Sequence, residues 1–520
     1  MTEIENPGIN TENIEEAVKY LGEAIGEKWV SNDHAVLSSY SRDFTITPGN
    51  WPNIVVIPGS TEDVQKIFRI AYRHKIPVVP ISSGFNHGGM CIPRKGGIMI
   101  DLIKRMDRVL DFDDETMTIT IQPGVRNAVV AELAEQHESI PGVRKIIAGL
   151  PLTMGSGSTL SNYFCRGGAS TMLKHGNTPE SIVSMTMVLP DGEVLKTGPS
   201  AMNEKSYLPV VSGPGPNIAG MFINSSGCFG ICTEMTIKLF PEPKLEEIQV
   251  FQVEDEDDPL IVEKIVDLIY RVTRLDICDF VYKTHGGALA NGNPDPEVNR
   301  EDSAEIMSEQ ILLIGVSGDD EEEIRIKMDI VTKMAEEAGC FKVMLEVFDE
   351  IFPDGFPFRR EARMRFSAYV GGQALGGKGS FQWLAGNPKL ELIPELSRGY
   401  EQLLEKYWKP TDPEYPRKRT MAGTAIQGPY PFGRCGTLEF DYWWDPSNVE
   451  TVKKGTQMIK KAANHLIAHR VPLWRNMYDH GELHIPLLGT YFDLLKKTKT
   501  EFDPDNLMHP DQIPCTDDYI

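Results

Sequence analysis

The sequence lacks an excess of positive charge. Its 520 residues carry 52 lysines and arginines against 75 aspartates and glutamates, so the formal net charge is −23. Proteins that bind nucleic acids or anionic membranes use basic faces to neutralise phosphate groups. The acidic balance therefore argues against both classes of partner.

Long hydrophobic runs are also missing. No uninterrupted apolar run approaches the roughly 18 residues of a membrane-spanning helix. The N-terminus carries Glu3 and Glu5 where a secretory signal has lysine or arginine, and no apolar segment follows. We expect no membrane span, no secretory signal and a cytoplasmic location.

Cysteine motifs are absent too. The eight cysteines are scattered, and the nearest pair, Cys228 and Cys232, has three residues between its members. Without a CxxC pair, neither a disulfide framework nor a zinc or iron–sulfur site is indicated. His465 and His469 are four residues apart, but the glutamate of a zinc-protease motif is missing. We expect reduced thiols and no metal site.

Helix and strand patterns alternate over the first 240 residues. Ser60 and Asp63 have capping-box spacing and predict the start of a helix. Period-two and 3.6-residue patterns predict helices over residues 13–26, 64–74 and 128–136, and strands over residues 53–58, 76–80, 98–102, 117–121, 182–189 and 236–240. The pattern indicates an α/β or α+β domain with its function in glycine-bearing loops.

The character of the chain changes after Pro241-Glu242-Pro243. Acidic runs at 254–258 and 319–323 predict exposed helix starts, where negative charge suits the helix dipole. The patterns predict helices over 261–273, 322–338, 451–469 and 491–500, a strand over 310–316, and long loops with some helix over 352–430. The middle of the chain therefore reads as a separate antiparallel α+β domain.

Three loops rich in small residues have the composition of a nucleotide site. The first, residues 80–89 (PISSGFNHGG), directly follows a predicted strand. Its glycines allow successive N–H groups to point at a pyrophosphate, although a plain turn is an equal alternative. The second runs over 155–162 and leads to Gly167-Gly168, and the third runs over 213–217 and leads to Gly230-Ile231.

The order of these motifs resembles the vanillyl-alcohol oxidase / p-cresol methylhydroxylase superfamily of FAD-dependent oxidoreductases. The resemblance spans nearly the whole chain. It is carried by PISSGFNHGG, GGIMIDL, TITIQPGV, GSGSTLSN with RGG, VLPDGEVLKTG, GPGPNIAGMF with GICTEMTIKLFP, and FDPDNLMHP.

The resemblance implies an α+β fold of two domains. Residues 1–243 and the returning residues 451–520 would form the FAD-binding domain, and residues 244–450 an antiparallel sheet-and-helix cap. The implied FAD contacts are Pro80, Ser82, Ser83, Gly84, Phe85, Asn86, His87, Gly88, Gly89, Pro123, Gly124, Gly155, Ser156, Ser158, Thr159, Ser161, Asn162, Gly168, Gly230 and Ile231. His87 lies in the loop that tethers FAD covalently in some members.

One branch of the superfamily binds phenolates through two tyrosines and an arginine. Its Tyr-Arg pair falls on Trp474-Arg475, so the arginine matches and tryptophan replaces tyrosine. Its other tyrosine falls on Gly89, which has no side chain. These departures argue against a 4-alkylphenol substrate.

The glycolate oxidase / D-lactate dehydrogenase branch offers a second comparison. Its Glu-His-Gly corresponds to Asp479-His480-Gly481. Its metal-binding strand corresponds to residues 433–439, where the histidines are missing and Arg434 stands instead. The resemblance therefore implies no metal in this chain.

We predict a FAD-dependent oxidoreductase that transfers a hydride from a small organic alcohol or hydroxy acid to the flavin. His480 would act as the base with Asp479 orienting it, Arg475 and Arg434 would supply positive charge, and Trp474 would stand among the catalytic residues in the place of the phenolate-binding tyrosine. A packed loop histidine and a surface ion pair are the structural alternatives for His480 and Arg475. Alternative functions are a 4-alkylphenol or aryl-alcohol dehydrogenase or oxidase, and a non-catalytic FAD-binding subunit.

Electron transfer sets the partners that we expect. A dehydrogenase would pass electrons to a protein such as a cytochrome, an electron-transfer flavoprotein or an iron–sulfur protein, whereas an oxidase would use oxygen. We favour the dehydrogenase, and we expect a homo-oligomer.

Overall fold

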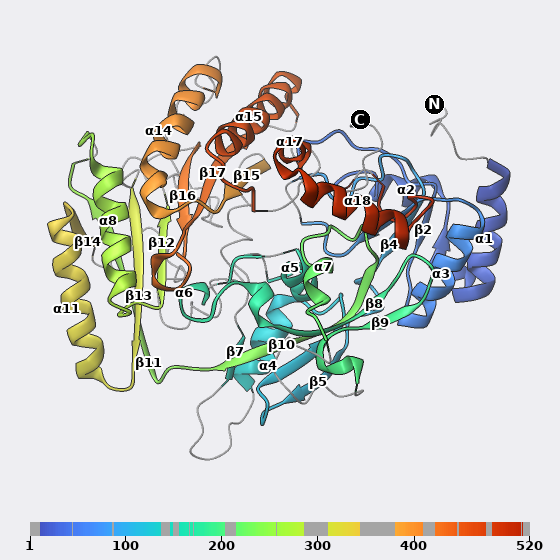
Figure 1. The fold of residues 1–520 in the computed structure, drawn as a ribbon, viewed down its shortest axis with the longest axis horizontal. Coiled ribbons are helices and arrows are strands. Elements are labelled where there is room, and N and C mark those ends of the chain that lie inside the picture. Colours follow the sequence, from blue (N-terminus) through green and yellow to red (C-terminus); the bar gives the residue numbers. More distant parts are fainter. Residues whose placement is uncertain are drawn as a thin grey trace.

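The structure, a computed structural model, contains three β-sheets with helices packed on them (Figure 1). It describes residues 11–43, 45–85, 88–136, 146–148, 155–165, 167–169, 171–202, 215–255, 257–284, 310–343, 380–408, 422–444, 447–474, 481–510 and 512. Two sheets are built from the first 241 residues, and the third is built from residues 245–444.

The first sheet is small and mainly parallel. Its strands, in spatial order, are β1 (Val30–Ser31), β2 (Ile54–Val56), β4 (Ile98–Asp101) and β3 (Val78–Ile81). The strands β2 and β4 read as continuous apolar runs because helices cover the sheet and bury them. These helices include α1 (Thr11–Ile25) and α3 (Thr61–Arg73), which pack together. The predicted cap of α3 is confirmed, since Ser60 Oγ accepts a hydrogen bond from the Asp63 N–H at 3.2 Å.

The second sheet is antiparallel. Its strands are β5 (Val109–Asp113), β6 (Thr118–Ile121), β10 (Ile231–Pro241), β8 (Ile182–Val188) and β9 (Val194–Lys196), and β7 (Ile146–Ala148) also pairs with β10. Its apolar core is shared with α4 (Asn127–Gln136), α5 (Thr159–Phe164) and α7 (Ala219–Phe222). Together with the first sheet it forms the region for which the sequence resemblance implies FAD binding, and we call it the FAD-binding region.

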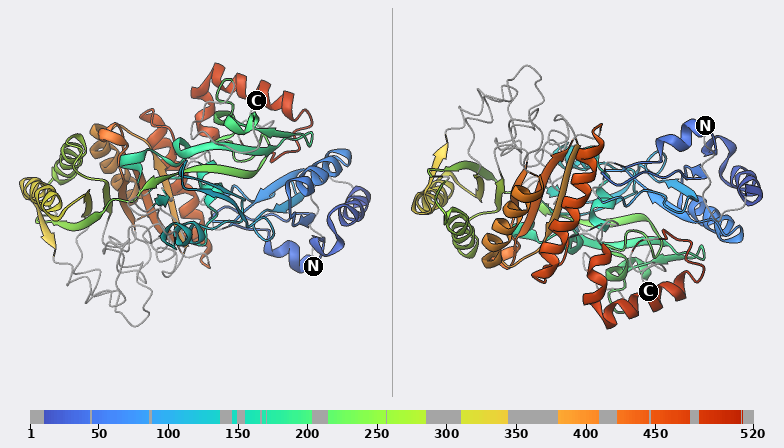
Figure 2. Two further views of the ribbon diagram at one scale, coloured as in Figure 1. Left: turned by 90° about the horizontal axis from the view of Figure 1, so that it is seen from below. Right: turned by 90° about the horizontal axis from the view of Figure 1, so that it is seen from above.

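The third sheet is the cap sheet and is also antiparallel. Its strands are β14 (Cys340–Val343), β11 (Leu245–Val253), β13 (Ile311–Gly318), β12 (Phe280–Thr284), β16 (Ala422–Gln427), β17 (Thr437–Trp444) and β15 (Ser380–Gly386). The helices α8 (Ile261–Arg274), α11 (Glu321–Glu337), α14 (Ile393–Leu403) and α15 (Val449–Ala468) pack on it through one large apolar core (Figure 2). The α+β fold with an antiparallel cap is therefore confirmed.

The two faces of the cap sheet have different chemistry. Leu384, Ile426 and Phe440 belong to the core under the helices. Because successive side chains of a strand point to opposite faces, their neighbours along the strands lie on the other face. Strand register aligns Tyr282 with Gln427, and Trp383 with Asp441, and Glu439 shares the side of Asp441. We call these five residues (Tyr282, Trp383, Gln427, Glu439 and Asp441) the inner face of the cap.

The end of the chain returns to the FAD-binding region. After α17 (Ile485–Leu488), α18 (Thr490–Phe502) packs against the core of the second sheet. Residues 507–509 then run beside β3: the Val78 N–H donates to Leu507 O at 2.8 Å, and the His509 N–H donates to Val78 O at 2.7 Å.

Every helix and strand predicted above has a counterpart in the structure. The prediction of long loops with some helix over residues 352–430 was wrong in part, because β15 and β16 lie there besides α14. The predicted domain limits at 243 and 450 stay a proposal. Since α15 packs into the core of the cap, the packing favours a cap that extends to about residue 474.

None of the helices in the described part of the chain combines the length and the apolar composition that a membrane crossing requires. The seven cysteines among the described residues have free thiols.

Candidate functional site

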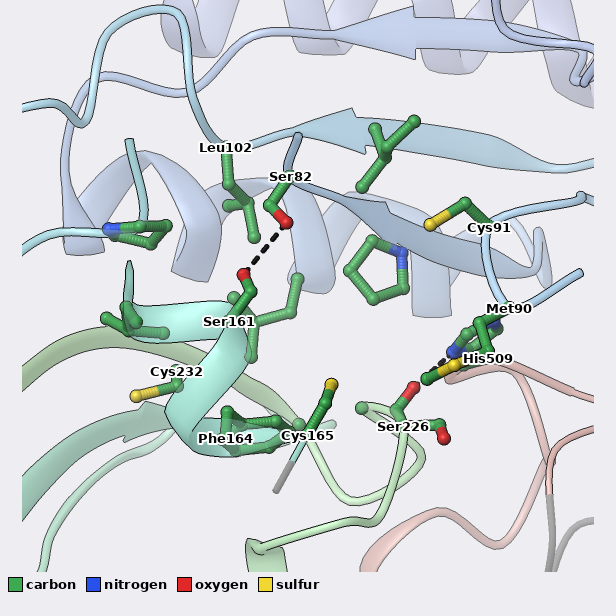
Figure 3. Close-up of a pocket in the computed structure, with 17 residues that line it drawn as sticks. Ser82, Met90, Cys91, Leu102, Ser161, Phe164, Cys165, Ser226, Cys232 and His509 are labelled. Carbon is green, nitrogen blue, oxygen red and sulfur yellow. Dashed lines mark hydrogen bonds between the residues drawn. The ribbon is translucent and has the colours of Figure 1, made fainter. Parts of the chain in front are cut away.

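A cavity of about 100 Å³ lies between the two sheets of the FAD-binding region (Figure 3). Its walls come from the loop after β3, from α5, from the start of β10 and from the chain end at His509. Six predicted FAD contacts line it, namely Pro80, Ser82, Pro123, Ser161, Gly230 and Ile231. The rest of the lining is mostly apolar and includes Leu160, Phe164 and Met90.

The first loop leaves β3 at Ile81 and turns twice through positive φ. Gly84 has φ +72° and Gly89 has φ +70°, a backbone region that disfavours residues with a Cβ. Ser82 Oγ accepts a hydrogen bond from Ser161 Oγ at 2.8 Å, which ties this loop to α5 across the cavity. Phe85 is exposed. Gly88 is described, whereas Asn86 and His87 lie outside the described residues.

The second loop holds its shape by its own polar side chains. Ser158 Oγ accepts from the Ser161 N–H at 3.1 Å and donates to Pro123 O at 2.6 Å. Thr159 Oγ1 donates to Asn127 Oδ1 at 2.9 Å.

These side chains already have partners inside the protein. Asn162 Nδ2 donates to Ser158 O at 2.9 Å, and the Ser158 N–H reaches Ser83 Oγ at 3.4 Å. The carbonyl of Gly155 accepts from the Ala128 N–H at 2.9 Å, whereas Ser156 is exposed. A direct contact of these residues with FAD stays a prediction.

At two glycines around the cavity, one backbone segment packs directly against another and leaves no room for a side chain. A Cβ at Gly230, which has φ +136°, would lie 2.5 Å from Val188 O. A Cβ at Gly124 would lie 2.5 Å from Ile103 O. Only glycine fits at either position.

His509 lines the cavity and was not among the predicted site residues. Its Nδ1 lies at hydrogen-bonding distance from Ser226 O, so Nδ1 carries the proton and donates. Burial, as the largest cause, lowers the pKa of His509 to about 4. The imidazole is therefore neutral near pH 7. The FDPDNLMHP motif was the available signal, because its last residues include His509.

A buried ion pair positions this chain end. Lys499 Nζ donates to Asp503 Oδ2 at 2.6 Å and to Met508 O at 2.8 Å, and both charged side chains are almost fully buried. Asp503 also accepts from the Met508 N–H at 2.8 Å and from the Tyr72 hydroxyl at 2.6 Å. Residues 507–509 are thereby fixed against β3 beside the cavity.

Three cysteines (Cys91, Cys165 and Cys232) also line the cavity. Burial raises the pKa of the Cys232 thiol far above its ordinary value. A buried thiol of this kind stays protonated and is a poor nucleophile. Cys232 therefore contributes apolar wall.

A second group of predicted residues meets where the cap contacts the FAD-binding region. A Cβ at Gly168 would lie 2.8 Å from Trp474 Cζ2 and 2.9 Å from Gln427 Oε1. Trp474 is 2% exposed, and its ring centre is 5.6 Å from that of Trp383. The predicted pocket residue Trp474 and the predicted FAD contact Gly168 are therefore neighbours. We call the meeting point of Gly168, Gln427 and Trp474 the seam.

The inner face of the cap carries buried acidic side chains. Glu439 is 5% exposed and Asp441 is 3% exposed. Burial, followed by the charges of Glu439 and Asp441, raises the pKa of the Tyr282 hydroxyl well above its usual range. None of its acidic residues was predicted from the sequence.

The predicted residue Arg434 is not brought to this place. Arg434 is exposed, and its Nη1 donates to Pro431 O at 3.3 Å while the guanidinium lies over the Phe432 ring. Arg475, Asp479 and His480 lie outside the described residues. Among the residues that the structure describes, no group of three or more His, Cys, Asp or Glu side chains could hold a metal ion.

Comparison with known sequences gives partial matches. Residues 52–198 match the family described as FAD binding domain. The chain is 29% identical over 300 residues to D-lactate dehydrogenase (cytochrome) 1, mitochondrial, of Saccharomyces cerevisiae, covering 52% of this chain and 48% of the relative. It is 31% identical over 267 residues to the 1'-carboxy-chondrochloren decarboxylase of Chondromyces crocatus, covering 50% and 46%. The chain thus spans about half the length of these curated relatives.

Comparison with solved structures covers nearly the whole chain. p-Cresol methylhydroxylase with substrate bound superposes with a TM-score of 0.79 at 19% identity, covering 97% of both chains. 4-Ethylphenol oxidase from Gulosibacter chungangensis in its isoeugenol complex gives 0.76 at 20% identity, covering 97% and 98%. At this identity the likeness shows the fold.

This fold and this domain indicate FAD as the cofactor, and the cavity of about 100 Å³ has room for only a part of it, since sites for whole ligands have about 300–1,000 Å³. A nucleotide needs an elongated space between two supports, with apolar walls and close backbone. The cavity lies between two sheets, and two glycines with positive φ, Gly227 and Gly230, line it.

Proposed function

We propose that the chain belongs to the vanillyl-alcohol oxidase / p-cresol methylhydroxylase superfamily of FAD-linked oxidoreductases and oxidises a small organic alcohol or hydroxy acid, a proposal supported by the FAD binding domain match, the fold and the partial sequence matches. One observation supports this proposal above the others. The seam joins the inner face of the cap to Gly168, four residues after the end of α5, and α5 itself lines the cavity.

Different parts of the chain would bind the cofactor and the substrate. Bound FAD supplies a hydride acceptor, and the protein supplies orientation, electrostatics and a site for the substrate proton. The loop after β3, α5 and the start of β10 hold the cofactor. The inner face of the cap and the seam hold the substrate and exclude water.

The base for the hydroxyl proton is proposed to be His480. Its pairing with Asp479 and the positive charge of Arg475 rest on the resemblance alone. A base within hydrogen-bonding reach accelerates such a step by about 10²–10⁴-fold. His480→Ala is expected to slow anaerobic flavin reduction by that factor at saturating substrate. Unchanged reduction rates across pH would place the base elsewhere.

Anaerobic bleaching of the bound flavin tests the function directly. The protein is mixed with three sets of compounds: 2-hydroxy acids, aryl alcohols and 4-alkylphenols. We expect reduction by members of the first two sets. Reduction by 4-alkylphenols alone would favour the alternative of a p-cresol methylhydroxylase type of enzyme. A flavin that no set reduces would favour a non-catalytic FAD-binding subunit and contradict the proposal.

In the second half of the reaction the reduced flavin passes its electrons to an acceptor. We propose a dehydrogenase that passes electrons to a protein, of the cytochrome, electron-transfer flavoprotein or iron–sulfur class. Hydrogen peroxide release in air at the rate of flavin reduction would identify an oxidase instead. A cytoplasmic location and a homo-oligomer also remain proposals, and the first relative above carries a mitochondrial name. Fractionation and light scattering test these two points.

A further inference from the structure

A second cavity, of about 340 Å³, lies on the second sheet, on the face that points away from its apolar core. Strands β5, β6, β8, β9 and β10 and the short 3₁₀ turn η3 (Gly198–Ala201) contribute to its walls. Pockets that bind small molecules have about 300–1,000 Å³. We call this cavity the trough, and its polar lining includes Thr120, Thr186, Lys196, Glu234 and Thr236.

Irregular strand pairing hollows the sheet at this place. The register between β10 and β8 shifts between Cys232 and Glu234, and again between Thr236 and Ile237. An extra residue bends and twists a strand, and such bulges are frequent beside functional sites. The first shift also turns Glu234 to the face opposite Cys232, so that Cys232 lines the first cavity and Glu234 lines the trough.

The floor of the trough consists of hydroxyl groups that are bonded to their neighbours. Thr186 Oγ1 donates to Glu234 Oε2 at 3.1 Å, and Thr120 Oγ1 lies 2.9 Å from Thr236 Oγ1. A hydroxyl group has one proton and two lone pairs, so Thr186 Oγ1 can still accept a hydrogen bond but has no second proton to donate. Thr186 and Glu234 therefore both offer acceptors to a ligand.

Opposite charges stand on the two sides of Thr186. Strand register pairs Thr186 with Glu234 of β10 and with Lys196 of β9. Neighbouring strands are about 4.8 Å apart, so about 10 Å separates the Cα atoms of Glu234 and Lys196. Both side chains are half-buried, and within the described part of the chain neither has an ion-pair partner. Charges withdrawn from water are normally paired, so this arrangement indicates a ligand that bridges them.

The two charges select the class of ligand. A cation alone would leave Lys196 unmatched, an anion alone would leave Glu234 unmatched, and a neutral polyol would match neither charge. A small zwitterion carries an ammonium group for the acceptors and a carboxylate for the lysine. Asp111, the third charged residue of the lining, is exposed, so water already solvates its carboxylate.

We propose that the trough is a second binding site, for a small zwitterion of the amino-acid class. The ammonium group of the ligand donates to Glu234 and to Thr186 Oγ1, and its carboxylate accepts from Lys196 Nζ. Strand β10 borders both cavities, but the residues that bind the zwitterion are separate from those that line the first cavity. The inference therefore goes beyond the proposed function and does not depend on it.

Four probes of similar size test the class of ligand. L-Alanine carries both charges, L-alaninamide carries only the ammonium group, propanoate carries only the carboxylate, and propanamide carries neither. None has a hydroxyl group, so none is an alcohol substrate of the proposed function. Ligand-observed NMR titration of the FAD-loaded protein gives the dissociation constants. We expect L-alanine to bind at least about fivefold more tightly than either singly charged probe, and propanamide to bind most weakly.

Two substitutions assign each preference to one residue. Lys196→Met removes the cation, so the preference for L-alanine over L-alaninamide should disappear while the preference over propanoate stays. Glu234→Gln keeps an acceptor for Thr186 and removes the negative charge, so the preference over propanoate should disappear while the preference over L-alaninamide stays. A residue with a merely structural role would weaken the binding of all four probes alike, and that result would overturn the inference.

Lys238→Met is the matched control. Lys238 lies further along β10 and outside the lining of the trough, where its Nζ donates to Glu180 O at 3.3 Å. This variant should retain both preferences. If the Glu234 variant does not fold, Lys196→Met still tests the site, because Lys196 ends a strand at the edge of the sheet.

Three results would contradict the inference: no binding of L-alanine, equal affinities for the four probes, or preferences that survive in both trough variants. The same preferences lost in Lys238→Met would show that the charge of the sheet as a whole sets the binding, and would also overturn it. None of these results depends on flavin reduction, so the proposed function would stand.

Discussion

The FAD-binding region and the cap form their sites in different ways. The cavity of the FAD-binding region is shaped by backbone: positive-φ glycines, serine-capped turns and a returning chain end close around it. The inner face of the cap is shaped by side chains that alternate along strands β12, β15, β16 and β17. The first kind of site depends on short contiguous motifs. The second depends on register between segments that are far apart in the sequence.

The two regions also treat polar groups differently. Around the cavity, the side chains of Ser158 and Asn162 form hydrogen bonds within their own segment, and the Thr159 hydroxyl donates a hydrogen bond to Asn127. At the seam, by contrast, Trp474 Nε1 and Gln427 Oε1 have no partner among the described residues. A site whose polar groups hold its own loops keeps its shape without a ligand. A site with unpaired groups sacrifices stability for binding.

The largest effect is expected from adding a side chain to the backbone-built site. Gly230→Val places a Cβ 2.5 Å from Val188 O at φ +136°, so strand β10 must move away from β8. We expect a loss of FAD from the purified protein and a fall in the free energy of unfolding of more than about 3 kcal/mol. Bound flavin is measured by absorbance, and stability by urea denaturation.

Gly339→Val is the matched control for this change. Gly339 also has a positive φ, +79°, but no atom lies within 4 Å of its Cβ position in the cap. The cost should be about 1–2 kcal/mol of backbone strain, with full FAD content. If Gly230→Val retained full FAD and lost no more stability than this control, the view that close backbone packing makes the cavity would be wrong.

A somewhat smaller effect is expected from the ion pair beside the cavity. Lys499→Met leaves the buried carboxylate of Asp503 without its cation, and breaking such a pair from one side costs about 3–5 kcal/mol. Urea denaturation should show this loss, together with weaker FAD retention, because residues 507–509 lose their anchor. Adding Asp503→Asn keeps an acceptor without the charge and should recover part of the stability. A double variant no more stable than Lys499→Met would contradict the electrostatic explanation.

The sequence predicted the backbone-built region well. Ser60 and Asp63 mark the start of α3, apolar runs mark β2 and β4, and the glycines of residues 80–89 mark the turn after β3. Each of these signals is local, since a cap, a buried strand or a glycine turn needs only a few adjacent residues. His509 was missed because a histidine in a loop reveals neither its burial nor the carbonyl that it contacts.

The cap was predicted less completely for a physical reason. Residues 380–444 contain strands β15, β16 and β17, but glycines, prolines and tryptophans interrupt their period-two pattern. Glu439 and Asp441 are buried on one face of a central strand, where sequence patterns predict apolar residues. Buried polar side chains of this kind break the local pattern, because in the sequence they look like solvent-exposed surface.

An intermediate effect is expected from pH. The pKa of His509 is about 4 in the folded protein and about 6.5 in the unfolded chain. Between these values the unfolded state binds more protons, so stability falls as pH decreases from 6.5 toward 4. The folded protein should lose about 2 kcal/mol between pH 7 and pH 5 through this group alone.

His509→Asn isolates this contribution. An asparagine amide can donate to the Ser226 carbonyl as Nδ1 does, and it does not titrate. Urea denaturation at pH 7 and pH 5 should therefore show a smaller pH dependence in the variant, by about 2 kcal/mol. Equal pH dependence in variant and wild type would show that folding leaves the pKa of His509 unchanged, and it would contradict the burial argument.

The smallest effect is expected at the ionic contact between the two regions. Lys174 Nζ of the FAD-binding region lies 3.1 Å from Asp279 Oδ1 of the cap and 3.3 Å from Ser317 Oγ, and its side chain is 49% exposed. A half-exposed pair of this kind contributes about 0–1 kcal/mol, because water and salt screen it. Lys174→Met should therefore change the free energy of unfolding by less than about 1 kcal/mol, and the difference should vanish in high salt.

Arg325→Met on α11, which breaks the exposed pair with Asp329 inside the cap, is the control and should give a similarly small change. If Lys174→Met instead cost several kcal/mol at all salt concentrations, the cap would be held to the FAD-binding region by charge. A small effect would favour the other contact between the two regions, the apolar packing of Trp474 on Gly168 at the seam, as the one that holds them together.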